Sequence, residues 1–87
     1  MAEPAAATIR YFAAARAAAG TTQEQITLSG ETTVALLLTA AIELHGPELA
    51  RVLPRCSYLL NAVAVRDTDT PISAGQVLDI LPPFAGG

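Results

Sequence analysis

The chain of 87 residues contains no lysine and no tryptophan, and its basic residues are five scattered arginines. Nucleic-acid binding needs Lys and Arg clustered on one face, and a formal net charge of -3 opposes it. We therefore expect no nucleic-acid partner. Because the chain also offers no lysine amine as an acyl acceptor, it can enter an amide or isopeptide linkage only through its own C-terminus.

Cysteine and histidine are each present once, as Cys56 and His45. A single thiol excludes an internal disulfide, and one Cys with one His does not make a zinc site. No glycine-rich loop precedes a helix, so no nucleotide site is indicated within the chain. We expect neither a metal nor a resident cofactor, and we interpret Cys56 as a small, buried apolar residue.

Long apolar runs are also missing. None approaches the roughly 20 residues that a membrane-spanning helix needs, and residues 1–7 lack the basic start and apolar core of a secretory signal. We expect a cytoplasmic protein with no membrane partner. Apolar residues make up 52% of the sequence and charged residues 15%, which is typical of a folded globular chain of one domain.

The residue pattern divides the chain into three parts. Residues 1–7, rich in Ala and Pro, are expected to be a disordered extension; residues 8–81 form the domain, and residues 82–87 a flexible tail. Apolar residues at helical spacing, preceded by Thr32 or Thr33 as a cap, predict a long helix over 34–45 that ends at Gly46-Pro47. Short helical turns are indicated at 14–19 and 48–53. Strands are predicted at 8–13, 23–28, 57–61, 62–65 and 76–81.

The order of these elements predicts an α+β domain whose sheet is covered by helix on one face. Side chains alternate between the two faces of a strand, so each strand residue can be assigned to a face. An apolar cluster on the uncovered face would mark a partner surface. The residues expected in the core are Ile9, Tyr11, Leu78 and Ile80. The residues expected on the uncovered face are Phe12, Val65 and Leu81.

The sequence closes with Pro82-Pro83-Phe84-Ala85-Gly86-Gly87. Proline fixes φ and has no N–H, so the last strand must end there and the tail must leave the sheet. Two glycines carry the terminal carboxylate without neighbouring side chains, which suits entry into a narrow active site. Phe84 is a candidate anchor beside this tip, because aromatic residues often dominate interfaces.

Three segments together resemble the MoaD/ThiS family of ubiquitin-like sulfur carriers over residues 8–87. They are Ile9-Arg10-Tyr11-Phe12-Ala13, the helix start Thr33-Val34, and the closing run from Ser73 to Gly87. The diproline and double-glycine ending is most similar to MoaD, the small subunit of molybdopterin synthase, although Phe84 stands where Val is commoner. The resemblance implies a β-grasp fold, with a mixed sheet packed on one long helix.

The same resemblance implies a chemistry at the tail. Gly87, preceded by Gly86, would be adenylated and then converted to a thiocarboxylate that donates sulfur to a pterin precursor in molybdenum cofactor biosynthesis. The implied partners are a MoaE-type large subunit that holds the active site, a ubiquitin-activating-like adenylating enzyme that binds ATP and Mg, and a sulfurtransferase donor. The chain would then be a non-catalytic subunit. The expected partner-binding residues are Phe12, Val65, Leu81, Pro82, Pro83 and Phe84.

Three alternatives stay open from the sequence. The chain could carry sulfur for thiazole or cysteine biosynthesis, although the diproline speaks against thiazole, whose carriers generally lack it. It could be a ubiquitin-like modifier that forms amide bonds with target lysines. It could also be an interaction domain whose tail is chemically inert.

Overall fold

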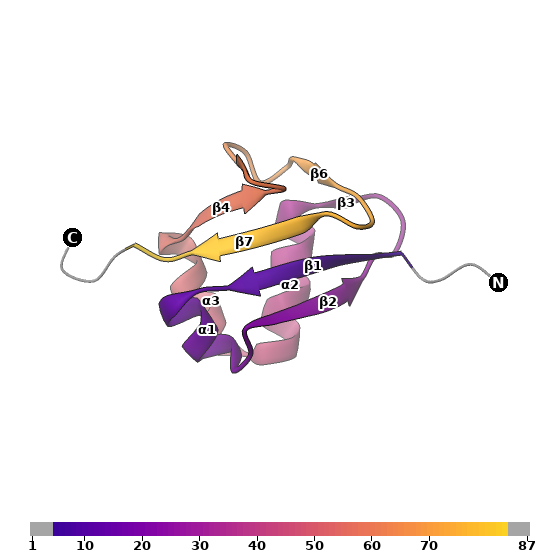
Figure 1. The fold of residues 1–87 in the computed structure, drawn as a ribbon. Helices are drawn as coiled ribbons and strands as arrows, with labels where there is room; N and C mark the ends of the chain where they lie inside the picture. The colour runs from indigo at the N-terminus through magenta and orange to yellow at the C-terminus, as the bar shows by residue number, and fades with distance from the viewer. Residues whose placement is uncertain (1–4, 84–87) are drawn as a thin grey trace.

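Two strands from opposite ends of the sequence, β1 (Ala6–Tyr11) and β7 (Val77–Leu81), lie side by side and parallel in the centre of the sheet (Figure 1). The computed structural model describes residues 5–83. On the outer sides, β2 (Gln23–Thr27) pairs with β1 and β4 (Ser57–Leu60) pairs with β7, both antiparallel. With β5, the sheet order is β2-β1-β7-β4-β5, so the predicted mixed sheet is confirmed.

The remaining elements are short apart from one helix. β5 (Val63–Ala64) is the edge strand beside β4, and β3 and β6 form a separate two-stranded sheet. Figure 1 shows the α-helices together on one side of the five-stranded sheet. The elements not yet given are α1 (Ala13–Ala19), β3 (Thr32–Thr33), α2 (Val34–His45), α3 (Pro47–Val52), a 3-10 helix (Leu53–Arg55) and β6 (Pro71–Ile72).

The expectation that the sheet packs on one long helix is wrong, because three α-helices of residues 5–83 cover it. α2 has 12 residues, but α1 and α3, with 7 and 6, add the buried side chains of Ala15, Ala19 and Leu49 to the core. Gly46, at φ 93, ends α2, and Pro47 starts α3 at a position where its missing N–H costs nothing. The Gly-Pro pair thus separates two helices rather than ending the helical region.

The first strand begins earlier than its sequence pattern indicates. β1 starts at Ala6 rather than at Thr8, and the Ala7 side chain is buried opposite Ile26 of β2. Alanine carries little strand signal of its own, so this pairing partner decides the boundary. The expected extension is therefore shorter than 1–7, and its first four residues lie outside the described residues.

The core lies between the sheet and the helices. Ile9, Tyr11, Leu78 and Ile80 are all buried, which confirms the predicted alternation along the two central strands. The helix α2 faces them with Val34, Leu37, Leu38 and Ala41. Its start is capped as predicted, since the Thr33 hydroxyl accepts a hydrogen bond from the Leu36 N–H at 3.2 Å.

Asn61 and Ala62 form the tight turn between β4 and β5. Their φ values are 47 and 68, and the residues on either side, Leu60 and Val63, pair directly. Two consecutive residues with positive φ define the type I′ turn that matches strand twist in a hairpin. Asn61 also fastens the turn to β7, because its N–H donates to the Val77 carbonyl and its Oδ1 accepts from the Val77 N–H, both at 2.8 Å.

Replacing Ala62 with glycine is expected to raise the free energy of unfolding by about 0.5–1 kcal/mol, since a Cβ makes left-handed backbone costly. Chemical denaturation followed by circular dichroism measures the change. Ala64→Gly in the neighbouring strand is the matched control, and it should lower stability by about the same amount. A loss of stability in Ala62→Gly would contradict the turn assignment.

The parallel arrangement of β1 and β7 places their carboxyl ends at the same edge of the sheet (Figure 1). Phe12 follows β1 and Pro82 follows β7, and the Phe12 N–H donates to the Ile80 carbonyl at 3.3 Å. The segment that leads into the C-terminal tail therefore leaves the domain directly beside Phe12.

Candidate functional site

An apolar groove lies where β7 gives way to the diproline. It has a volume of ≈ 650 Å³, and Phe12, a residue that is 37% exposed, forms part of its wall. The groove combines the ends of β1 and β7 with the first turn of α1 and the entry to β4. Its lining residues are Phe12, Ala13, Ala14, Arg55, Ser57, Leu81, Pro82 and Pro83.

The groove brings together four of the predicted partner-binding residues, namely Phe12, Leu81, Pro82 and Pro83. Leu81 pairs with Ser57 of β4, on the sheet face that the helices leave uncovered. The other predicted tail residues, Phe84, Gly86 and Gly87, lie outside the described residues. The structure thus places an apolar surface at the root of the tail.

Val65 does not belong to this groove, and its expected place on the uncovered face is corrected. Its N–H donates to the Tyr58 carbonyl at 2.9 Å, and Tyr58 pairs with the buried Ile80. Val65 therefore shares the helix-covered face, where it packs against the core. The two-residue turn at Asn61 and Ala62 sets this register, and a shift of one residue would have inverted it.

The uncovered face carries an ion pair that the sequence analysis missed. The Arg10 guanidinium donates from Nε and Nη2 to the two carboxylate oxygens of Asp79, at 2.6 and 2.7 Å. Asp79 is only 7% exposed, and its strand neighbour in the parallel pair is Arg10 itself. Such a bidentate pair is among the stronger polar contacts and fixes the guanidinium plane.

Arg10 in turn contacts the aromatic residue of the groove. Its guanidinium carbon lies 5.7 Å from the centroid of the Phe12 ring, within the range of a cation–π contact. A series of contacts thus crosses the uncovered face, from Asp79 to Arg10 and from Arg10 to Phe12. These contacts limit the orientations that the Phe12 ring can adopt. The available sequence signal was one charged residue in each central strand, Arg10 in β1 and Asp79 in β7.

The backbone beside Phe12 is unusual. Ala13 has φ 49, in the left-handed region that residues with a Cβ seldom adopt, and it lines the groove. Residues held in sparsely populated conformations persist where the surrounding structure determines them, and they gather at functional sites. The conformation of Ala13 occurs at the point where the extended backbone of Phe12 gives way to the helix α1.

A second polar cluster lies on the covered face. The Tyr11 hydroxyl donates to Oε2 of Glu24 at 2.5 Å, and Nε2 of His45 contacts the same oxygen at 2.5 Å. The Tyr11 and His45 rings also meet edge to face, with centroids 5.8 Å apart. This cluster joins the end of α2 to β1 and β2.

The cluster predicts a loss of stability in alkali. Burial, and then the hydrogen bond to Glu24, raises the pKa of Tyr11 in the fold, whereas an unfolded tyrosine ionises near pH 10. Above about pH 10 the folded chain then holds more protons than the unfolded chain, so the free energy of unfolding falls as pH rises.

Denaturant titrations between about pH 9 and pH 12 measure this dependence. Tyr11→Phe should flatten it. Tyr58→Phe is the comparison variant. Burial also raises the pKa of Tyr58, but its hydroxyl donates to the Leu53 carbonyl rather than to a carboxylate, so this variant should flatten the dependence less than Tyr11→Phe does. An unchanged slope in Tyr11→Phe would contradict the prediction.

Cys56 is a poor candidate for sulfur chemistry. Its Sγ donates to the Val52 carbonyl at 3.3 Å, and burial raises the pKa of its thiol. The thiolate is the reactive form of cysteine, and a raised pKa reduces its population at neutral pH. The contact with Val52 therefore gives Cys56 a packing role at the end of α3.

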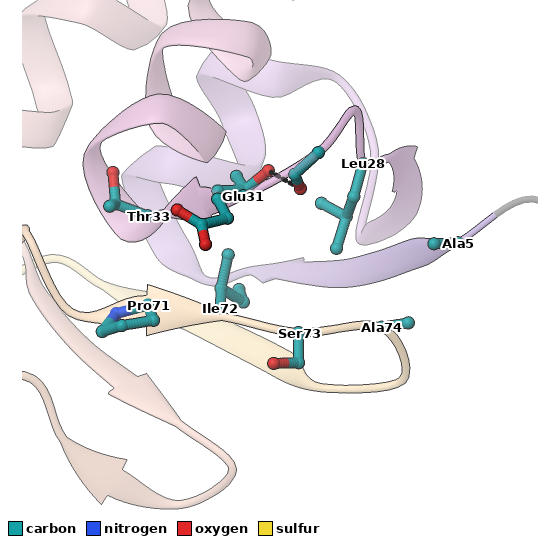
Figure 2. Close-up of a pocket in the computed structure, with 10 residues that line it drawn as sticks. Ala5, Leu28, Glu31, Thr33, Pro71, Ile72, Ser73 and Ala74 are labelled. Carbon is teal, nitrogen blue, oxygen red and sulfur yellow. Dashed lines mark hydrogen bonds between the residues drawn. The ribbon is translucent and has the colours of Figure 1, made fainter.

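A second concavity of ≈ 760 Å³ lies at the opposite edge of the sheet, between the start of β1 and the β6–β7 turn. Figure 2 shows Leu28, Glu31 and Thr33 on one side and Ile72, Ser73 and Ala74 on the other. Among the described residues, Glu31 is the only charged side chain in its lining. Within residues 5–83, the lining brings together neither a nucleophile with a base nor a set of metal ligands.

No group of three or more His, Cys, Asp or Glu side chains among residues 5–83 could hold a metal ion. In the same range, no helix combines the length and the apolar character needed to cross a bilayer.

Comparison with known proteins places these features in context. The sequence model of the ThiS family matches residues 9–87. The crystal structure of SAMP1 from Haloferax volcanii is similar at 27% identity, with 94% of this chain and 99% of that one covered and a TM-score of 0.83. A search of curated proteins found no match.

Two further structures share the fold at lower identity. One is in the protein–protein complex of subunits 1 and 2 of molybdopterin-converting factor from Helicobacter pylori, at 24% identity and a TM-score of 0.67, covering 94% of this chain and 99% of that one. The other is Urm1 from Trypanosoma brucei, at 16% identity and a TM-score of 0.75, with both chains fully covered.

Proposed function

Since the chain belongs to the ThiS family of ubiquitin-like sulfur carriers, we propose that it carries sulfur on Gly87 as the small subunit of a molybdopterin synthase. The observation that carries this proposal is the apolar groove at the root of the tail, where Phe12, Leu81 and the diproline meet. A protein that accepts the tail would find an apolar docking surface beside it.

The terminal carboxylate needs activation before it can accept sulfur. Its oxygen would attack the α-phosphorus of ATP in a separate adenylating enzyme, giving an acyl-adenylate at Gly87 and releasing pyrophosphate. A persulfide would then attack the acyl carbon and release AMP. A second thiol would cleave the resulting acyl disulfide, leaving the thiocarboxylate on Gly87 and a disulfide on the donor side.

The residues of this chain present the tail rather than catalyse these steps. Pro82 and Pro83 cannot donate ladder hydrogen bonds, so they end β7 and direct the chain out of the sheet. The six residues after Leu81 reach about 20 Å at most. Gly86 and Gly87 have no side chains, so the tip would fit successive narrow active sites.

The choice of a molybdopterin pathway rests on two features. The diproline before the tail resembles MoaD more than ThiS, whose tails generally lack it. A structural neighbour from H. pylori is subunit 1 or 2 of molybdopterin-converting factor, solved as a complex of the two subunits. By analogy, a large subunit would cover the groove and take up the tail.

Mass spectrometry of the protein from its native cells tests the proposal. Cleavage after Arg66 releases residues 67–87, a peptide without Met or Cys. Exchange of one terminal oxygen for sulfur would add about 16 Da, and oxidation of Met or Cys, which gives the same nominal gain, cannot occur in this peptide. An unchanged mass after incubation with adenylating enzyme, ATP and a persulfide donor would overturn the proposal.

A protein modifier is the second candidate. The Haloferax volcanii protein that is similar at 26% identity is named small archaeal modifier protein 1. In that role, Gly87 would form amide bonds with lysines of target proteins. Because this chain has no lysine, it could not build polymers on its own side chains, so a ladder of conjugates would report several lysines on one target.

A further inference from the structure

The root of the tail lies between two grooves rather than beside one. The second groove, of ≈ 340 Å³, is on the α3 side of the diproline and adds Arg51 and Val52. Both grooves share the side chains of Ala14, Arg55, Pro82 and Pro83. Arg55, at the end of the 3-10 helix, is thus the charged residue common to both sides of the tail root.

The charge of these grooves is opposite to that of the whole chain. The formal net charge is -3, yet the charged residues that line the two grooves are Arg51 and Arg55. Arg51 is engaged, since its Nη1 donates to Oε1 of Glu48 at 2.8 Å. Arg55 is exposed and, within residues 5–83, has no carboxylate within ion-pair distance.

The length of the tail determines which partner surface meets Arg55. Four residues follow Pro83, and they can extend at most about 13 Å. An active site that receives Gly87 must therefore open within that distance of Pro83. The rim of this opening then covers the grooves on either side of the diproline.

We propose that Arg55 binds an aspartate or glutamate on the sulfur-accepting large subunit, from a segment whose neighbouring apolar side chain fills the groove beside Phe12 and Leu81. This inference rests on the proposed function and specifies the partner's chemistry. The planar guanidinium suits a carboxylate, because it can donate two parallel hydrogen bonds. The apolar wall beside it lowers the exposure of the pair to water, which strengthens the attraction.

The test measures the binding of the full-length chain to the purified large subunit from the same organism, that is, the protein that corresponds to subunit 2 of molybdopterin-converting factor. Isothermal titration calorimetry at about 50 and 300 mM NaCl gives the affinity and its salt dependence. Arg55→Glu should weaken binding about tenfold at the lower salt, because a like charge then faces the partner's carboxylate. Arg55→Lys should weaken binding by about threefold, because it keeps the charge but loses the second parallel hydrogen bond.

Arg66→Glu is the matched control, because Arg66 is exposed, lines neither groove and gives the same change in net charge. It should alter binding by less than about twofold. Thermal unfolding of each variant checks that the fold is kept. A chain with a C-terminal amide at Gly87 forms the second arm, and in it the Arg55→Glu effect should persist.

Each outcome decides the matter. Equal losses in Arg55→Glu and Arg66→Glu, no loss in either, or no binding by the unchanged chain would overturn the inference. If Arg55→Glu had no effect in the amidated chain, Arg55 would pair with the terminal carboxylate of this chain rather than with the partner. That result would also overturn the inference. Charge-dependent binding without any thiocarboxylate would instead uphold this inference and reject the proposed function.

Discussion

Deleting Gly87 is expected to reduce sulfur loading by about 100-fold or more, with no change in the unfolding temperature. The deletion moves the terminal carboxylate back by about 3.3 Å, and a displacement of even 1 Å from a reacting group can cost about 100-fold in rate. Pyrophosphate release with the purified adenylating enzyme, together with the mass of the C-terminal peptide, measures the loss.

The matched control deletes Ala2, which removes one residue from the other end of the chain. It should load sulfur at the rate of the unchanged protein. Calorimetric scans of both deletions separate a loss of chemistry from a loss of fold. If the chain ending at Gly86 were still loaded with sulfur at the original rate, Gly87 would not be the sulfur-bearing residue.

Replacing Phe12 with arginine is expected to weaken the complex with the large subunit by about 2 kcal/mol or more, roughly 30-fold. The substitution removes the aromatic wall of the groove and places a second cation beside Arg10, which now contacts the Phe12 ring. Because Phe12 is 37% exposed and outside the buried core, the domain should remain folded. Calorimetric titration measures the affinity.

Leu44→Arg is the matched control for this experiment. Leu44 is an exposed apolar residue on α2, 63% accessible, and it lies on no groove beside the tail root. Its replacement adds the same charge and should leave the affinity unchanged. Equal weakening by both substitutions would point to net charge rather than to docking, and unfolding of Phe12→Arg would mean that Phe12 is required by the core.

Local patterns predicted much of this structure. Alternation along the first and last strands identified Ile9, Tyr11, Leu78 and Ile80 as core residues, and all four are buried. The helical spacing of apolar residues and the threonine cap of α2 were also predicted correctly, because both arise from contacts within a few residues. The diproline marked the end of the last strand for a similarly local reason.

The misplaced or missing features depend on contacts between distant segments. The face of Val65 follows from the register of β4 and β5, which the Asn61–Ala62 turn sets. Arg10 and Asp79 are 69 residues apart and meet only because β1 and β7 pair in parallel. The two-residue strands β3 and β6 contain too few positions for any alternation to be visible.

The central strand pair also determines how the domain responds to mechanical force. β1 begins at one edge of the sheet and β7 ends at the opposite edge, and the two are paired from Thr8↔Val77 to Tyr11↔Ile80 (Figure 1). Tension between these two ends loads the hydrogen bonds of the pair sideways and simultaneously, instead of opening them one by one. An unfolding machine that gripped the tail would therefore have to shear the most deeply buried ladder of the molecule before anything else could unravel.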